Sequence, residues 1–231
     1  MKSSMPEQML QMLIPIAEAL GEDLLPKFAF VGGSTTALLI TDPVTKQAVR
    51  FTDDVDLIFK ANNHAHWQSI QKQLRKKGFR ESMDDDIICR MRLGELKVDF
   101  MPDDERILGF SNRWYKDALT TAQSHKLTKN ISINILMPVY FIATKLEAYR
   151  GRGNNDPINS HDLEDIINLV DGREELLTEL ADADGNVRHY IAEHFTNLLL
   201  DNDFEYAVQG NIGDAARTDI LLQRMEQISK L

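Results

Sequence analysis

Cysteine, positive charge and long apolar runs are all scarce in this sequence. A single cysteine, Cys89, among 231 residues excludes an internal disulfide and makes a cysteine-based metal site an unlikely feature. No run approaches the roughly 18 apolar residues of a membrane span. The start of the chain also lacks the apolar core and cleavage site of a signal peptide, since Glu18, Glu22 and Asp23 interrupt its apolar positions. We therefore expect a cytoplasmic protein with no membrane partner.

The charge balance narrows the choice of partners. The formal net charge of −10 disfavours a broad, sequence-blind nucleic-acid groove, because such binding needs many Lys and Arg side chains to neutralise phosphates. A local basic run at 72–80 could steer a polyanion, although a solvated helix face with a glycine stop is the preferred interpretation. With 43% hydrophobic and 27% charged residues, the composition is that of an ordinary globular protein.

Hydrophobic periodicity predicts an α/β (α+β) chain whose pattern changes at about residue 138. We expect a mixed sheet in residues 1–137 and a helical half in residues 138–231. The strands expected are 27–31, 54–59, 87–93, 96–101 and 131–137. The strands 87–93 and 96–101 are expected to form a hairpin around Gly94 and Glu95. The helices expected are 6–20, 34–40, 62–77, 113–122, 139–150, 160–170, 173–181, 185–200 and 212–230. Residues 44–49, 103–106 and 151–156 are expected to be polar connections or loops.

A glycine turn follows the first strand. Gly32 and Gly33 allow positive φ and a close approach of the backbone to a ligand, because no Cβ stands in the way. Ser34 then opens the helix expected at 34–40, whose free N–H groups would point back at the turn. The turn is therefore a candidate phosphate cradle.

A pair of carboxylates lies on the next strand. In a strand, residues i and i+2 share a face, so Asp54 and Asp56 project together while Val55 faces the other way. Asp99 interrupts the apolar end of a later strand, and its distance in sequence allows that strand to be a neighbour. Carboxylate oxygens suit magnesium, so Asp54, Asp56 and Asp99 are candidate metal ligands and catalytic residues. An ordinary strand-end acid is the alternative for Asp99.

The joint pattern of Gly-Gly-Ser, Asp-x-Asp and a later lone Asp resembles the DNA polymerase β-like nucleotidyltransferase superfamily. The segment from Arg50 to Leu57, with Lys145 and the stretch 161–165 downstream, resembles more narrowly the AbiEii-type nucleotidyltransferases, a bacterial group that includes toxins of toxin-antitoxin systems. The resemblance covers roughly residues 27–170.

The resemblance implies roles for residues outside the two motifs. Lys145 would reach the nucleotide phosphates, with Gly32, Gly33 and Ser34 as the other nucleotide-binding residues. A surface lysine paired with a nearby acid is the alternative for Lys145. Asp162 and Asp165 share a helix face and would lie near the site, although an exposed helix flank explains them as well. Arg50 would hold either the strand or a phosphate.

These residues together predict a metal-dependent nucleotidyltransferase. Two Mg²⁺ ions, or Mn²⁺, would bind the three aspartates, and Asp99 would also serve as general base. The resemblance implies a nucleoside triphosphate donor, an acceptor that is a tRNA 3′ end or a protein, and an antitoxin protein as a possible partner. The alternatives are an aminoglycoside-type small-molecule nucleotidyltransferase and a catalytically idle binding protein of the same fold.

Overall fold

A computed structural model describes residues 5–152 and 156–231 of the chain. The described residues divide into two compact units. The sheet unit comprises Met1–Thr35 and Arg50–Met137, and the helical unit comprises Thr36–Val49 and Pro138–Leu231. Of the loop expected at 151–156, residues 153–155 lie outside the described residues, and the expectation is wrong at Gly151 and Arg152, which continue a helix that begins at Pro138.

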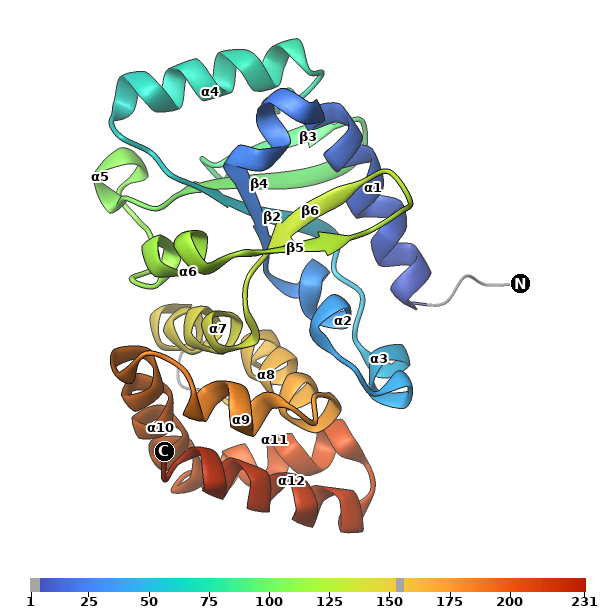
Figure 1. Cartoon of the computed structure of the whole chain (residues 1–231), viewed down its shortest axis with the longest axis vertical. Helices are drawn as coiled ribbons and strands as arrows, with labels where there is room; N and C mark the ends of the chain where they lie inside the picture. Colours follow the sequence, from blue (N-terminus) through green and yellow to red (C-terminus); the bar gives the residue numbers. More distant parts are fainter. Residues whose placement is uncertain (1–4, 153–155) are drawn as a thin grey trace. The chain divides into compact units, whose positions relative to one another are not determined.

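The sheet unit is built on a mixed six-stranded sheet, which establishes the expected α+β class (Figure 1). Its strand order is β3-β4-β2-β1-β6-β5. The strands are β1 (Phe28–Val31), β2 (Asp54–Phe59), β3 (Arg90–Leu93), β4 (Leu96–Pro102), β5 (Gln123–Lys126) and β6 (Ser132–Ile135). Five of them lie where strands are expected, and β3 and β4 form the expected antiparallel hairpin. The edge strand β5 was not expected, because its residues Gln-Ser-His-Lys carry no apolar alternation.

Helices surround this sheet (Figure 1). They are α1 (Met5–Leu24), α4 (His64–Lys76), α5 (Glu105–Leu108) and α6 (Tyr115–Thr121), with 3₁₀ turns η1 (Leu25–Lys27) and η2 (Gly33–Thr35). The backbone of α1 departs from helical geometry at Gly21, as a helix-ending glycine predicts. The loop expected at 103–106 is wrong in its second half, because Asp104 accepts a hydrogen bond from the Arg106 N–H and so caps the short helix α5.

The two faces of the sheet differ in character. One face carries Phe28, Phe59 and Phe100, whose rings meet at centroid distances of 5.5 and 5.4 Å. Trp67 of α4 stacks on Phe59 at 5.3 Å, so α4 covers this apolar face. Strand alternation turns Asp54 and Asp56 to the opposite face, because Leu57 and Phe59 occupy the apolar one.

In its described residues the helical unit contains helices and no strand, and from Pro138 onward this agrees with the expected helical pattern (Figure 1). They are α2 (Thr36–Leu39), α3 (Pro43–Ala48), α7 (Pro138–Arg152), α8 (His161–Gly172), α9 (Leu176–Ala181), α10 (Gly185–Leu199), α11 (Asn202–Ile212) and α12 (Ala215–Ile228). Two of them correct the sequence expectation. Helix α3 replaces the polar connection at 44–49, because Asp42 caps the Thr45 N–H at 2.7 Å and Pro43 suits a first helical turn. Helix α11 was not expected.

The helix expected at 34–40 is also corrected. The chain instead makes the 3₁₀ turn η2 and then only the four-residue helix α2. A helix this short has little dipole of its own, so the anion-binding argument from a helix N-terminus does not apply here.

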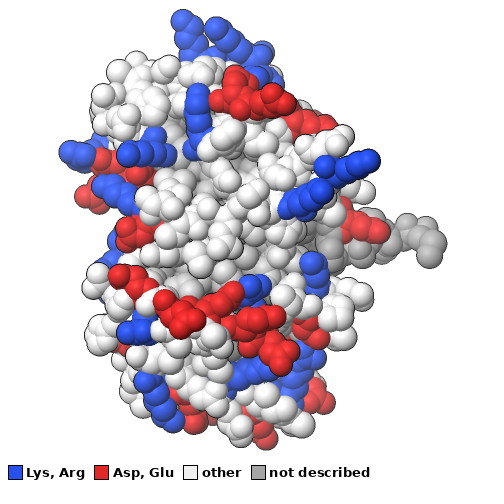
Figure 2. All heavy atoms as spheres, in the orientation of Figure 1, with Lys and Arg blue, Asp and Glu red and all other residues white. Residues whose placement is uncertain are grey.

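The surface agrees with the charge balance. On the face shown in Figure 2, Lys and Arg side chains are interspersed with Asp and Glu and do not merge into one basic area. In the part of the chain that the structure describes, no helix has the length and apolar character needed to span a membrane.

Candidate functional site

Strand pairing brings the three predicted aspartates to one face of the sheet. Strand β2 runs parallel to β4, and the register places Asp56 opposite Asp99 and Asp54 opposite Lys97. Residues opposite each other in a sheet project to the same side, and so do residues two apart on one strand. Asp54, Asp56 and Asp99 therefore share the face opposite the aromatic core, with Asp99 on the neighbouring strand that its sequence position allows.

The glycine turn lies directly against this face. Gly32 follows β1, whose last residue Val31 is opposite Asp56, and has a φ of 72°. A Cβ at Gly32 would lie 2.0 Å from Asp56 Oδ2, a distance no carbon can take up without displacing the carboxylate. Both the backbone conformation and the contact with Asp56 thus require glycine at this position.

The rest of the turn is more closed than a phosphate cradle requires. Gly33 and Ser34 are buried within η2, and the Ser34 hydroxyl donates to the Val31 carbonyl oxygen at 3.3 Å. The Thr35 N–H donates to the Gly32 carbonyl at 3.1 Å. The turn therefore lies against Asp56, while the Ser34 hydroxyl is engaged within the turn itself.

An arginine that the sequence reasoning missed joins two of the aspartates. Arg90 lies opposite Asp99 on β3, and its Nε and Nη2 donate to Asp99 Oδ1 and Oδ2 at 2.7 and 2.9 Å. The same Nη2 donates to Asp54 Oδ2 at 2.9 Å. Hydrogen bonding to Asp99 raises the pKa of Arg90 further above its ordinary value, so the guanidinium is permanently charged.

Three residues that precede Asp54 in the sequence differ in their contacts. The Thr52 hydroxyl donates to Asp54 Oδ1 at 2.7 Å, a contact that the sequence reasoning also missed. Asp53 points elsewhere and pairs with Lys97 at 2.6 Å, where the hydrogen bond from Lys97 lowers the pKa of Asp53. Arg50 was expected to hold either the strand or a phosphate. Its Nη1 donates to the Phe51 carbonyl at 3.4 Å.

The donor set suits a hard divalent cation in its chemistry. The three carboxylates on this face supply oxygen ligands of the kind that Mg²⁺ prefers. Two of these carboxylates, Asp54 and Asp99, already bind the Arg90 guanidinium. Among the residues described, however, no group of three or more His, Cys, Asp and Glu side chains is arranged to hold one metal ion together. The residues fit a metal ion as ligands, with Arg90 engaged at two of them.

The remaining predicted residues form a second ion cluster inside the helical unit. Lys145 Nζ of α7 lies 3.0 Å from Asp162 Oδ1 and 2.6 Å from Asp165 Oδ2 of α8. The Thr36 hydroxyl donates to the second oxygen of Asp165 at 3.1 Å. Burial alone would lower the pKa of Lys145, but the charges of Asp165 and Asp162 outweigh it and raise that pKa. Lys145 is thus a buried lysine committed to two carboxylates, and Asp162 and Asp165 are not an exposed flank.

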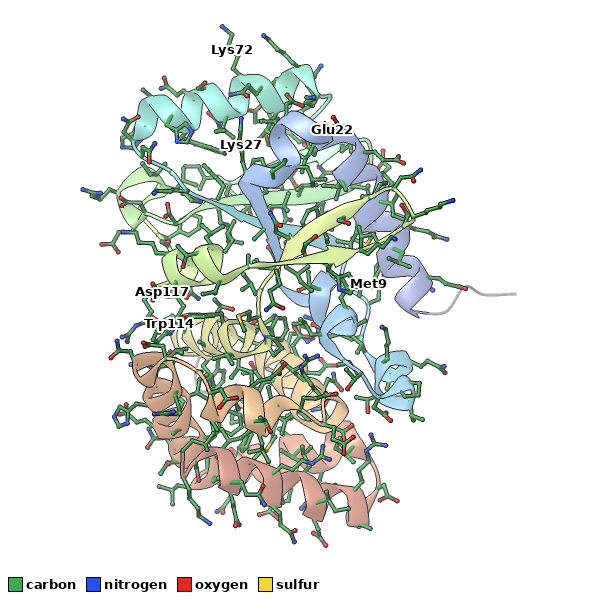
Figure 3. All side chains as sticks on the ribbon, in the orientation of Figure 1. Met9, Glu22, Lys27, Lys72, Trp114 and Asp117 are labelled. Atoms are coloured by element: carbon green, nitrogen blue, oxygen red, sulfur yellow. The ribbon has the colours of Figure 1, made fainter. Side chains whose placement is uncertain are left out.

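The basic run at 72–80 behaves as a solvated helix face. Arg75 pairs with Glu81 and Lys77 pairs with Asp23, both at 2.5 Å. Lys72 extends outward from α4 (Figure 3). Two of the five cations in this run are therefore compensated locally.

A cavity of about 520 Å³ opens elsewhere in the sheet unit, by the start of β1 and the end of β2. Ala29 and Asn134, which are paired in register on the aspartate face, contribute to its wall. Figure 3 shows Lys27 at the N-terminal end of β1. The charged side chains of the lining are Lys27, Lys60, Asp103, Asp104, Arg106 and Lys116, four cations against two carboxylates. Positive charge therefore prevails in this cavity, although the protein as a whole is acidic.

Comparison of the sequence with protein-family models gives no match, and a search of curated proteins gives none either.

Proposed function

We propose that the protein is a metal-dependent nucleotidyltransferase of the polymerase β-like type, moving a nucleoside monophosphate from a nucleoside triphosphate to an acceptor hydroxyl. The observation that supports this best is the single-face arrangement of Asp54, Asp56 and Asp99 beside the Gly32 turn. Buried or half-buried carboxylates on one sheet face are costly unless they hold a cation. A cation site next to a glycine turn suits the handling of a triphosphate.

Each residue of the site has a distinct part in this proposal. Asp54 and Asp56 would hold the metal ion, and Thr52 orients Asp54 by donating to its Oδ1. When bound, a divalent cation neutralises phosphate charge and favours ionisation of the attacking hydroxyl. The acceptor oxygen would bond to the α-phosphorus while the bond to the bridging oxygen breaks and pyrophosphate leaves. The hydroxyl proton would pass to water, because Asp54 and Asp56 hold the metal ion.

In this proposal Asp99 is not the general base that the sequence analysis expects. Both of its oxygens accept from Arg90, which makes it less available to take up a proton from a substrate. We therefore assign Asp99 to positioning Arg90, whose fixed charge would stabilise negative charge developing on the phosphates. Lys145 belongs to the buried cluster of the helical unit, and we assign it to stability there rather than to phosphate binding.

The cationic cavity favours a phosphate-bearing acceptor over a cationic drug. The excess of Lys and Arg in its lining would attract an RNA end and repel an aminoglycoside. Among the acceptors that the resemblance implies, a tRNA 3′ end is therefore our choice, with a protein hydroxyl as second. A catalytically idle protein would have no need for three carboxylates on one face.

The test is incubation of the purified protein with each α-labelled nucleoside triphosphate, Mg²⁺ and total tRNA or cell extract. We expect one macromolecule to become labelled, and Asp56→Asn to lower the rate by about 10³-fold or more because a metal ligand is lost. Asp53→Asn is the matched control, since Asp53 lies three residues away, is largely exposed and pairs with Lys97. Full activity in Asp56→Asn, or equal loss in both variants, would refute the assignment.

A further inference from the structure

The position of Arg90 bears on how many metal ions the site takes. Arg90 and Asp99 face each other across the β3–β4 hairpin, and the arginine side chain is only 10% exposed. Its guanidinium binds Asp99 through two parallel hydrogen bonds and reaches Asp54 with a third. This two-point geometry is the strongest form of an arginine–carboxylate contact.

The guanidinium lies where a metal ion shared by Asp54 and Asp99 would have to bind. Such an ion needs oxygen atoms of both carboxylates, and Arg90 Nη2 lies 2.9 Å from an oxygen of each. An ion could bind there only if the guanidinium moved, and Arg90 would then lose three charge-assisted hydrogen bonds. An arginine cannot leave as a neutral group, since it stays charged throughout the accessible pH range.

The other side of the cluster is different. Asp54 is 29% exposed at its side chain, whereas Asp99 is 9% exposed. Asp54 Oδ1 accepts from Thr52, and each carboxylate oxygen has a further lone pair. Asp56, on the same face and pressed against Gly32, provides the second carboxylate for an ion on this side.

We propose that Arg90 takes the place of one metal ion, so that the site binds a single divalent cation through Asp54 and Asp56. The positive charge that a second ion would bring between Asp54 and Asp99 is carried by the protein itself. This inference rests on the proposed function, and it replaces the two-ion expectation from the sequence by one ion and one arginine.

The experiment counts Mn²⁺ ions by electron paramagnetic resonance, with MnCl₂ alone and with each α,β-methylene nucleoside triphosphate. The ions counted are those that disappear when Asp54→Asn is added to each protein, because Asp54 is common to both metal positions and an acidic protein also binds Mn²⁺ weakly at its surface. We expect one ion per wild-type chain and two in Arg90→Met, where the place between Asp54 and Asp99 is open. The melting temperature of Arg90→Met should also rise more on adding Mn²⁺ than that of the wild type.

Arg92→Met is the matched control. Arg92 lies two residues along the same strand and binds Asp85 through two contacts of 2.7 and 2.8 Å, away from the three aspartates. We expect this variant to bind one ion, like the wild type. If Arg90→Met does not fold, Arg90→Gln replaces it, since glutamine keeps polar contacts to the carboxylates without the charge.

The outcomes separate this inference from the proposed function. Two ions on the wild-type chain, or one ion in both the wild type and Arg90→Met, would overturn the inference and leave a metal-dependent transferase intact. No ion in any variant would overturn both.

Discussion

Each of the two units contains a cation held by two of the aspartates that the sequence singled out, and these two clusters differ in their access to solvent. In the sheet unit, Arg90 joins Asp54 and Asp99, and the Asp54 side chain keeps 29% of its surface exposed. In the helical unit, Lys145 joins Asp162 and Asp165, whose side chains are 8% and 0% exposed. Similar charges therefore occur in one partly open and one closed environment.

This difference separates a site from a structural element. Oppositely charged side chains that are buried away from water compensate each other's charge. Removing one of them leaves the other charged and desolvated. The closed cluster also includes the Thr36 hydroxyl, so it ties three segments of the helical unit together. The open cluster has a partly exposed carboxylate, Asp54, which an ion from solvent can reach. We infer that the lysine cluster serves stability and the arginine cluster serves binding.

Among the substitutions that test this comparison, removal of the buried lysine should change the stability most. Lys145→Met leaves Asp162 and Asp165 charged and uncompensated, so we expect a loss of about 3–5 kcal/mol in the free energy of unfolding. Urea denaturation followed by circular dichroism measures it. Lys230→Met is the control, because Lys230 is 74% exposed and should cost less than about 0.5 kcal/mol. A loss below about 1 kcal/mol in Lys145→Met would show that the cluster is not structural.

The contrast between the clusters was only partly accessible from the sequence. Strand alternation predicted the shared face of Asp54 and Asp56, and the helical pattern after Pro138 was confirmed. Arg90 could have been found, since a two-residue turn at Gly94 and Glu95 pairs residue 90 with residue 99. The hairpin register therefore contained the signal for Arg90, whereas the pattern of carboxylates on which the site was predicted did not include this cation.

Other features had no sequence signal strong enough to find them. Strand β5 is polar and is held only by pairing with β6, so no alternation marks it. The ion pairs of Lys145 with Asp162 and Asp165 depend on how α7 packs on α8, which tertiary structure alone decides. The helix expected after Ser34 was wrong because local propensity gave way to a 3₁₀ turn that buries Gly33, Ser34 and Thr35.

A substitution in the glycine turn should have a smaller effect on stability and tests the role of this turn in the open cluster. Gly32→Ala adds a Cβ 2.0 Å from Asp56 Oδ2 in a left-handed backbone conformation, so we expect a loss of about 2–4 kcal/mol in stability. Transfer activity should fall by about 10²-fold or more even where the protein remains folded, because Asp56 is displaced.

Gly94→Ala is the matched control for the backbone term. Gly94 has a similar φ of 60°, and an added Cβ there meets nothing within 4 Å. It should cost about 1–2 kcal/mol without loss of activity. Equal effects of the two substitutions on activity would mean that contact with Asp56 does not matter.

The smallest effect is a pH dependence reported by Cys89, the neighbour of Arg90 in the open cluster. Burial, together with the charges of Asp99 and Asp56, raises the pKa of the Cys89 thiol to about 12, from an ordinary value of 9.0. The neutral thiol therefore stabilises the fold fully below about pH 9, and this contribution is lost as the pH rises from 9 towards 12. At pH 10 we expect about 1 kcal/mol less stability relative to Cys89→Ala than at pH 8.

Denaturation curves of the wild type and Cys89→Ala at pH 8, 9 and 10 measure this difference. Asp56→Asn should reduce the change, because one of the charges that raises the thiol pKa is removed. A difference between the two proteins that stays constant across this range would contradict the assignment.

The most direct test of the central claim is a crystal structure with Mn²⁺ and an α,β-methylene nucleoside triphosphate, in which anomalous scattering locates the metal. The account predicts one peak within about 2.5 Å of carboxylate oxygens of Asp54 and Asp56, with Arg90 still on Asp99 and no peak at Asp162 or Asp165. An absent peak at Asp54 and Asp56, or a peak in the lysine cluster, would contradict the division of the molecule into a binding cluster and a structural one.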